Sequence, residues 1–256
     1  FFFFSFLLFL YFPSVLFGQI KPMDIPPFNA GEEIQYHAIY QWGFIEIKAG
    51  KVQFNVDTIT HVDQSCFYFR SIGNSIPKYD WIYKVRDTFK SIVVKDSFRP
   101  IYYERNTNEG DLNVLNKTYF EANEERIDME LYNSDKGSSF KSIPYEAGIL
   151  DLQTAVYYAR LISFKNAMMG DEYTFKVIID GERYDIPIRY EGKENIELDD
   201  YTYSCYRIST QVIEGTIFKS HETIKIWVTD DGRQIPVKVE APIIVGVVKA
   251  ELIENP

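Results

Sequence analysis

The sequence predicts a mainly β protein built on a curved antiparallel sheet or barrel, with a single linking helix at about residues 151–166. Three observations predict this fold. Apolar and polar residues alternate in many short segments, which is typical of strands that bury one face. Turn-forming residues separate most of these segments. Helical spacing of apolar residues stands out once, after Asp151, so one helix is expected among the strands.

The first strands are predicted from this alternation. Residues 33–41 and 51–57 place apolar side chains on one face, and Gly43 and Gly50 punctuate the connection, which is typical of an antiparallel hairpin. Further strands in the first half are predicted at residues 66–72, 81–85, 89–94, 101–105, 112–121 and 126–132. Because such strands have one apolar face, the sheet must curve around a core or close into a barrel.

The helix is predicted to begin at Asp151, whose carboxylate can cap the first turn, and Gly170 suits the far end of this segment. Its apolar stripe consists of Leu152, Val156, Ala159 and Ile162. We expect about four helical turns that cover one end of the sheet and bury this stripe against the inner face.

After the helix the alternation returns. Strands are predicted at residues 173–179, 222–228, 234–241 and 245–253. The pair Asp231-Gly232 predicts a tight hairpin turn, because both residues tolerate a positive φ.

The two halves on either side of the helix correspond in spacing. Gly31 and Gly170 are 139 positions apart, as are Cys66 and Cys205, and both halves contain an Asp-x-x-Arg turn, beginning at Asp96 and Asp230. These matches predict two pseudo-repeats, residues 31–145 and 170–254. Chance is the alternative explanation, because alternating strands of similar composition match one another easily.

The start of the chain predicts export. Residues 1–17 carry no charged side chain and are almost wholly apolar. A transmembrane helix needs roughly 20 apolar residues, so this run predicts a signal peptide over residues 1–18, without its basic n-region, in preference to an uncleaved anchor. We expect a periplasmic or extracellular protein with a single β-rich domain over residues 19–256 and no transmembrane span.

The charge of the chain bears on its partners, and its two cysteines bear on whether it contains a disulfide. The chain has 37 acidic and 27 basic residues, a net charge of −10 and no run of Lys or Arg, which argues against a nucleic-acid partner. An exported chain meets oxidising conditions, so Cys66 and Cys205 could form one disulfide. The alternative is two buried thiols that act as small apolar side chains.

Several short motifs, taken in order, carry a family resemblance. They are Gly31-Glu32-Glu33-Ile34-Gln35-Tyr36, Tyr40-Gln41-Trp42-Gly43, Val85-Arg86-Asp87, Asp151-Leu152-Gln153-Thr154-Ala155 and Ile226-Trp227-Val228. In order and spacing they resemble the domain of unknown function 3108 (DUF3108) family of exported bacterial proteins, over nearly the whole chain after the leader. The resemblance implies a β-rich, periplasmic or envelope-associated protein. It supplies no activity, cofactor or catalytic residue.

Few residues form a recognisable chemical motif. The three histidines are scattered and no cysteine or histidine pair has ligand spacing, so we expect neither a metal site nor a cofactor. Tyr36, Tyr40, Trp42 and Trp81 could line a cavity for an apolar chain or a sugar ring. Packing in the core explains the same four residues equally simply.

Three functions are consistent with these features. The first is a non-catalytic binding or scaffold module for a lipid, a glycan or an envelope protein partner. The alternative is a hydrolase of envelope polysaccharide or peptide, which requires two carboxylates facing each other across a cleft. A purely structural subunit is the third, and it predicts an exposed apolar patch or an unpaired edge strand.

Overall fold

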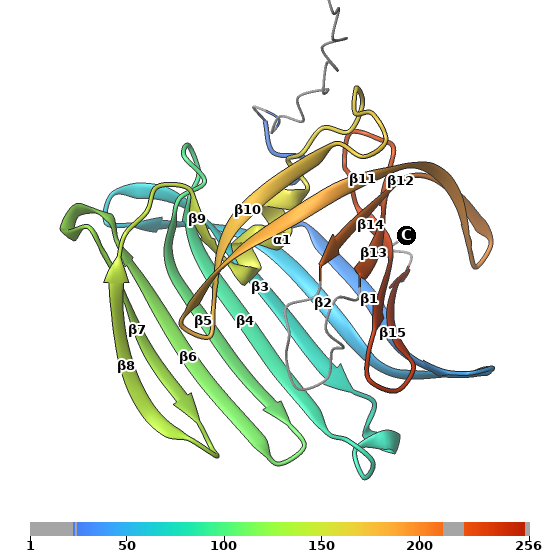
Figure 1. Ribbon diagram of the computed structural model, residues 1–256, viewed down its shortest axis with the longest axis horizontal. Helices are drawn as coiled ribbons and strands as arrows, with labels where there is room; N and C mark the ends of the chain where they lie inside the picture. The colour runs from blue at the N-terminus through green and yellow to red at the C-terminus, as the bar shows by residue number, and fades with distance from the viewer. Residues whose placement is uncertain (1–22, 24, 212–222, 254–256) are drawn as a thin grey trace, which may run out of the picture.

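The computed structural model describes residues 23, 25–211 and 223–253, and this part of the chain forms one sheet of fifteen strands and one α-helix (Figure 1). The predicted signal peptide, residues 1–18, lies outside the described residues. The strands are β1 (Glu33–Trp42), β2 (Ile45–His61), β3 (Gln64–Ser75), β4 (Val85–Val94), β5 (Pro100–Glu109), β6 (Leu112–Glu121), β7 (Arg126–Asn133), β8 (Gly137–Pro144), β9 (Ile149–Asp151), β10 (Glu172–Ile179), β11 (Glu182–Leu198), β12 (Tyr201–Gln211), β13 (Thr223–Thr229), β14 (Pro236–Pro242) and β15 (Val247–Ile253).

The strands pair in an almost uninterrupted meander. The order across the sheet runs from β8 down to β1 and continues from β15 down to β9, so the first and last long strands meet at the β1–β15 pair. All pairs are antiparallel except β9 with β10. The prediction of a mainly β protein with a large curved antiparallel sheet is therefore confirmed.

The sheet is rolled, with its two ends overlapping. Strands β8 and β9 end the sheet and do not pair with each other. Instead, Asp180 in the β10–β11 turn forms an ion pair of 2.8 Å with Arg105 of β5, and Glu182 of β11 pairs with Lys141 of β8. In Figure 1 the β10–β11 turn overlies the middle of β5 and β6. Side chains, and not strand pairing, therefore join the two ends.

Residues 149–164 fill the inside of the roll and contribute to three apolar clusters. Leu150, Ile162 and Phe164 pack with strands β10–β13, whereas Tyr157 and Leu161 pack with β2–β4 and with Phe28. Ile149 belongs to the third cluster, with Tyr103, Phe120, Ile127, Met129 and Ile178. The core thus occupies the end of the roll where this segment crosses.

Helix α1 (Leu152–Ala159) begins as predicted. The fully buried carboxylate of Asp151 accepts a hydrogen bond from the backbone N–H of Thr154 at 2.8 Å and another from the Ser91 hydroxyl at 2.6 Å. This is the N-cap geometry, in which a side-chain oxygen satisfies one of the N–H groups that the first turn leaves free. The same carboxylate also holds the helix against β4.

The predicted end of the helix at about residue 166 is wrong, because α1 ends at Ala159. A longer helix would need the carbonyl groups of residues 160–162 as acceptors. Those groups are already occupied: the Gln234 side-chain amide donates to the carbonyls of Arg160 at 2.5 Å and Ile162 at 2.8 Å, and the Met23 N–H donates to Leu161. A residue more than seventy positions away therefore ends the helix.

The predicted apolar stripe is also only partly correct. Ile162 is fully buried, but Val156 is exposed, and the helix buries Gln153, Thr154, Ala155 and Tyr157 instead. Because the helix is short and has several strands around it, its buried face is wider than the stripe and includes polar residues. The Ser71 hydroxyl, for example, donates to the Gln153 side-chain carbonyl at 2.8 Å.

The strand predicted at residues 81–85 is not formed. Residues 76–84 form a connection that contains a short 3-10 helix, Pro77–Tyr79, and β4 begins only at Val85. Asp80 anchors this connection, because its carboxylate pairs with the Arg86 guanidinium at 2.6 Å and accepts from the Ser75 hydroxyl. Local side-chain bonds therefore satisfy this segment without strand pairing.

The meanders β1–β6 and β10–β15 have the same strand order, and the turn after β4 has the same backbone hydrogen bonds as the turn after β13. After β4, the Val94 N–H donates to the Arg99 carbonyl and the Lys95 N–H to the Ser65 carbonyl. After β13, the Thr229 N–H donates to Ile235 and the Asp230 N–H to Ser204.

This match equates Cys66 with Cys205, because they pair with Val94 and Thr229, but it equates Asp96 with Asp231 and not with Asp230. Pro100 and Pro236 also pair with equivalent valines beside equivalent register shifts. Duplication remains a prediction, and these equivalences support it with a one-residue correction of the turn.

The Gln234 contacts give a test of how the helix end is held. We expect Gln234→Ala to lower the free energy of unfolding by about 3 kcal/mol, because two buried carbonyl groups lose their donor. Urea unfolding followed by circular dichroism measures the change. Gln64→Ala, at an exposed position after β2, is the matched control and should be nearly neutral. Equal stabilities for the two variants would contradict this account of the helix end.

Candidate functional site

Three connections between strands lie side by side at one end of the roll. They are the β1–β2 turn, the β3–β4 connection and the β14–β15 turn. The β1–β15 and β2–β3 pairings make them neighbours, and two hydrogen bonds join them: the Tyr40 hydroxyl donates to the Val245 carbonyl at 3.0 Å, and the Ile76 N–H donates to the Ala49 carbonyl at 2.8 Å. The three connections therefore form one continuous surface.

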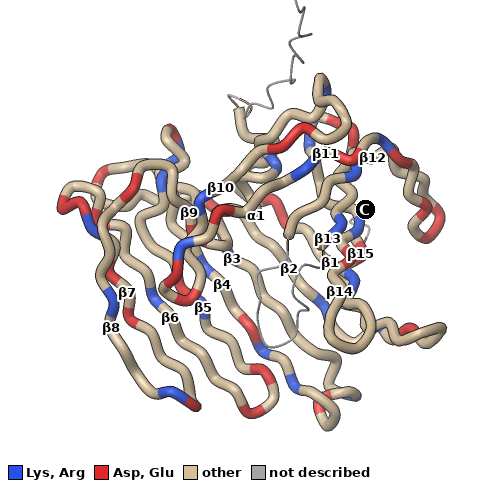
Figure 2. The backbone as a smooth tube through the Cα atoms, viewed as in Figure 1, with Lys and Arg blue, Asp and Glu red and all other residues tan. Residues whose placement is uncertain are grey.

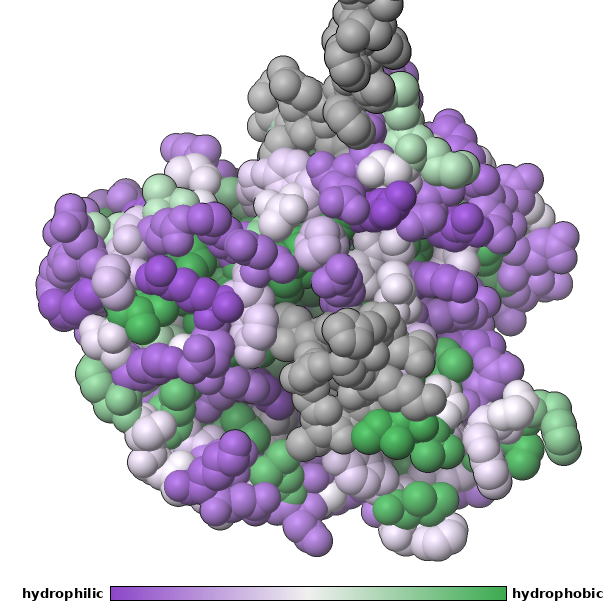
Figure 3. Space-filling view, viewed as in Figure 1, coloured by the Kyte–Doolittle hydropathy of each residue, from purple (hydrophilic) through white to green (hydrophobic). Residues whose placement is uncertain are grey.

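This surface is unusually apolar for an exposed one. We define its exposed apolar residues as the rim: Trp42, Phe44, Ile45, Trp81, Ile82, Tyr83, Ile244, Val245 and Val248. Phe44 is 100% exposed, Trp81 82% and Trp42 59%. In Figure 3 hydrophobic surface gathers at the lower right, where these connections lie. Contiguous exposed apolar groups are costly in water, so such a patch typically marks an interaction site.

A pair of carboxyl groups lies on the wall next to the rim. Asp87 of β4 pairs with Thr107, and Glu109 of β5 pairs with Val85, so the two acids occupy neighbouring positions on adjacent strands. The Asp87 carboxylate accepts a hydrogen bond from the Asn108 N–H at 3.1 Å. Asp87 follows the phase of residues that face the core, which directs it towards the inside of the roll.

The environment of Asp87 favours its protonated form. Burial, followed by the negative charge of Glu109, raises the pKa of Asp87 from 3.8 to about 7, although Arg105 and the Asn108 N–H oppose this shift. The hydroxyl of Tyr83, a rim residue, lies close enough that burial and the charges of Glu109 and Asp87 raise its pKa as well. Hydrogen bonding with Glu109 raises the pKa of Asp87 further, by less than burial and charge do.

Arg105 is occupied by another partner. Its guanidinium donates to both oxygens of Asp180, at 2.9 and 2.8 Å, and the Asn116 amide donates to the same carboxylate at 2.8 Å. Arg105 therefore does not fully neutralise the acid pair. The resulting site is a half-buried carboxyl group that can give or take a proton near neutral pH, beside an apolar surface.

The four aromatic residues predicted to line a ligand site separate into two groups. Trp42 and Trp81 both lie in the rim. Tyr36 is buried, and its hydroxyl donates to the Pro236 carbonyl at 2.9 Å, while the Tyr40 hydroxyl bonds the β14–β15 turn. Both tyrosines thus connect β1 to the neighbouring strands. Whether any of the four contacts a ligand stays a prediction.

The two cysteines are free and buried. Cys66 is the third residue of β3, and its thiol donates to the Gln64 carbonyl at 3.6 Å. Cys205 lies in a small separate cluster with Trp227 and Val237. Burial raises the pKa of the Cys205 thiol to about 12 and raises that of Cys66 too, so both are poor nucleophiles at neutral pH.

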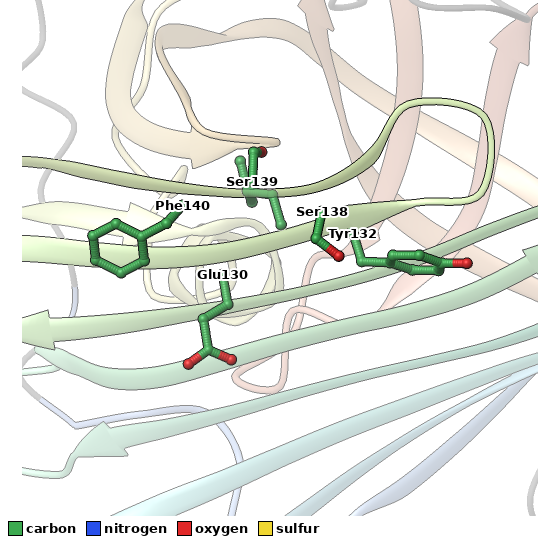
Figure 4. Close-up of a pocket in the computed structure, with 6 residues that line it drawn as sticks. Glu130, Tyr132, Ser138, Ser139 and Phe140 are labelled. Carbon is green, nitrogen blue, oxygen red and sulfur yellow. The ribbon is translucent and has the colours of Figure 1, made fainter.

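A second surface feature lies on the edge hairpin β7–β8. A depression of about 490 Å³ lies there, lined by residues that include Glu130, Tyr132 and Phe140, and Phe140 is 67% exposed. Figure 4 shows these side chains on the hairpin. Strand β8 ends the sheet, so the backbone groups on its outer side have no strand partner in the described part of the chain. This edge is the kind of feature predicted for a structural subunit.

The site residues that the sequence analysis missed are Asp87, Glu109 and Phe44. A signal for Asp87 was present: it interrupts the alternating apolar positions Val85, Phe89 and Val93 with a charged residue. An acid in the buried phase of a strand is uncommon unless it is paired. Phe44 follows Gly43 at a hairpin tip, where an aromatic residue has no core to enter.

The described residues contain no group of three His, Cys, Asp or Glu side chains arranged to hold a metal ion. The same part of the chain contains no helix with the length and apolar character needed to cross a membrane.

The fold and site define an open β-barrel-like protein formed by one rolled sheet. The chain belongs to the family described as "Protein of unknown function (DUF3108)", whose sequence profile matches residues 35–253. The family resemblance of the sequence motifs is thereby confirmed. No curated protein sequence matches the chain.

Two solved structures match the chain to different degrees. A β-barrel-like protein of the domain of unknown function DUF1849 from Brucella abortus superposes with a TM-score of 0.52 at 7% identity, covering 91% of this chain and 98% of the other. The hypothetical protein CT021 from Chlamydia trachomatis matches with a TM-score of 0.33 at 8% identity, covering 86% and 85%. The first likeness supports the fold alone.

The raised pKa of Asp87 predicts a pH dependence of stability. Between about pH 4 and about pH 7 the unfolded chain releases a proton that folded Asp87 keeps, so this residue makes stability fall as the pH rises through that window. We expect Asp87→Asn to remove this contribution and to flatten the curve of unfolding free energy against pH. Urea unfolding at several pH values measures it. A variant with the slope of the original protein would show that Asp87 titrates normally.

Proposed function

We propose that this protein is an exported, non-catalytic binding module of the bacterial cell envelope, whose contact surface is the rim. The partner has an apolar surface, which includes lipids and the apolar faces of envelope proteins. Export is inferred from the apolar segment at residues 1–17 and from the resemblance to a family of exported proteins.

The observation that carries the proposal is the asymmetry of the roll. At one end, residues 149–164 fill the interior and apolar side chains are buried. At the other end, apolar side chains of three connections point outward instead. A chain could avoid this cost by placing polar residues at the turns, as it does at Asn133–Gly137 between β7 and β8. The exposed Trp, Phe and Ile residues are therefore best explained by a partner that covers them.

The acid pair favours a hydrolase as a second candidate. Asp87 has a pKa of about 7, which suits a general acid at neutral pH, and Glu109 is an adjacent carboxylate. Its position on the wall beside the rim would place it near a bound polymer. The binding module remains the first proposal, because the rim involves three connections and the acid pair only two strands.

Photocrosslinking in intact cells tests the binding module. We expect a photoreactive phenylalanine analogue at Phe44 to form a discrete crosslinked product, because this side chain is fully exposed at the tip of the β1–β2 hairpin. The same analogue at Phe140, exposed on the edge strand β8, is the matched control and should form less of it. Products of equal yield at both positions, or none at Phe44, would overturn the proposal.

The hydrolase alternative predicts a different result. If the acid pair is catalytic, both Asp87→Asn and Glu109→Gln should lower hydrolysis of envelope polysaccharide or peptide by about 100-fold or more, while Asp135→Asn in an exposed turn should not. Release of soluble fragments from purified cell-wall polymer measures the rate. Turnover that is absent, or the same in all variants, would eliminate this candidate.

A further inference from the structure

We propose that the rim docks on the surface of an anionic phospholipid bilayer. This inference rests on the proposed function and names its partner. Apolar side chains on three neighbouring connections would enter the boundary between headgroups and acyl chains, and basic residues next to them would contact lipid phosphates.

The charge around the rim is more positive than that of the whole chain, which carries a net charge of −10. The three segments that hold the rim, residues 42–51, 76–86 and 241–249, contain six basic residues and two acidic ones. The neighbouring acids Asp87, Glu109 and Asp111 bring the acidic residues to five, so basic residues are still in the majority here. Their positions along the backbone can be followed in Figure 2. An anionic surface would therefore attract this end of the molecule and repel the rest of it.

Ion pairs neutralise the acidic residues of the three segments and leave most of the basic ones unpaired within the described structure. The two acidic residues of the segments are both neutralised: Asp80 pairs with Arg86 at 2.6 Å, and Glu46 with Lys249 at 2.8 Å. The four remaining basic residues are all exposed and have no ion pair with another described residue. These residues are Lys48, Lys51, Lys78 and Lys84. Four exposed ammonium groups without an ion pair in the described part of the chain thus lie on two of the three segments, where they can meet phosphates.

The residue types suit an interface between water and lipid. Trp and Tyr gather at this depth of a bilayer because each has a large apolar ring and a polar group that stays hydrated. The rim holds Trp42, Trp81 and Tyr83, together with Phe44 and aliphatic residues. A protein partner would also accept aromatic side chains. Unpaired lysines, however, are depleted from the cores of protein interfaces, so their abundance around the rim favours a lipid surface.

The arrangement allows the residues to act together. A flat bilayer is contacted only by side chains that extend from one end of a molecule. The β14–β15, β1–β2 and β3–β4 connections are neighbours at one end of the sheet, and the hydrogen bonds from Tyr40 and Ile76 hold them to one another. Residues from all three connections therefore lie at the same end of the fold.

The tryptophans provide a direct readout. The chain has three, and two are exposed in the rim, whereas Trp227 is only 6% exposed in a separate cluster. Adding vesicles that contain phosphatidylglycerol should shift the fluorescence of the full chain to shorter wavelength. The double variant Trp42→Phe and Trp81→Phe keeps only Trp227 and should show no shift. Lipids brominated near the headgroup should quench the tryptophan fluorescence of the original protein and leave that of the double variant unchanged.

Co-flotation with the same vesicles measures affinity. We expect partition into phosphatidylglycerol vesicles to exceed that into phosphatidylcholine vesicles by at least about tenfold and to weaken with salt. Lys48→Gln and Lys84→Gln should each lower it about fivefold, the factor for one basic residue at an anionic surface. Lys165→Gln, an exposed lysine after α1, is the control and should have no effect. Phe44→Ser should weaken partition, whereas Phe140→Ser should not.

Other occupants give other results. Equal partition into both kinds of vesicle, or no fluorescence shift with either, would overturn the lipid inference. If the vesicle experiments fail in this way but Phe44 still crosslinks to a protein in cells, the binding module stands and its partner is a protein. Self-association in the absence of vesicles that Phe44→Ser abolishes would instead identify a second copy of the chain as the partner. Loss of both the crosslinks and the partition would reject the proposed function as well.

Discussion

The fold depends on one constraint: the concave face of the rolled sheet must be covered, and at the filled end residues 149–164 cover it together with Phe28. Their side chains belong to all three interior clusters. Their polar groups are satisfied from both meanders, because Ser91 of β4 bonds Asp151 at the start and Gln234, after β13, bonds the carbonyl groups at the end. Burial of apolar area provides the driving force, and these bonds fix where the segment lies.

Most strands could be predicted, because a sheet with one buried face imposes a period of two on the sequence. The start of α1 could be predicted as well, since an N-cap is a local interaction between Asp151 and the next turn. The end of α1 could not, because Gln234 arrives from another part of the chain. The prediction of a strand at residues 81–85 was wrong for a related reason: the Asp80–Arg86 ion pair stabilises a connection where the residue pattern favours a strand.

The candidate site was only partly visible in the sequence. Aromatic residues indicated it, and Trp42 and Trp81 are both exposed at one end of the roll, but Tyr36 is also aromatic and is buried in the wall. Exposure depends on where each strand ends relative to its neighbours, which sequence periodicity does not determine. The uncompensated lysines are harder still to recognise, because Lys249 and Arg86 look like Lys48 and Lys84 until their acidic partners are located in space.

The overlap of the two sheet ends has a mechanical consequence. In a closed barrel the number of strands and their register set the diameter, and no strand can move without breaking backbone pairing. Here the circumference is completed by side chains: the partly exposed ion pairs of Arg105 with Asp180 and Lys141 with Glu182, and the buried cluster in which Ile149 and Ile178 pack against β5–β7. Exposed ion pairs contribute little free energy, so the buried cluster is the stronger of the two connections. The diameter of the roll is therefore set by apolar packing, and a wider roll would have to expose this cluster to water.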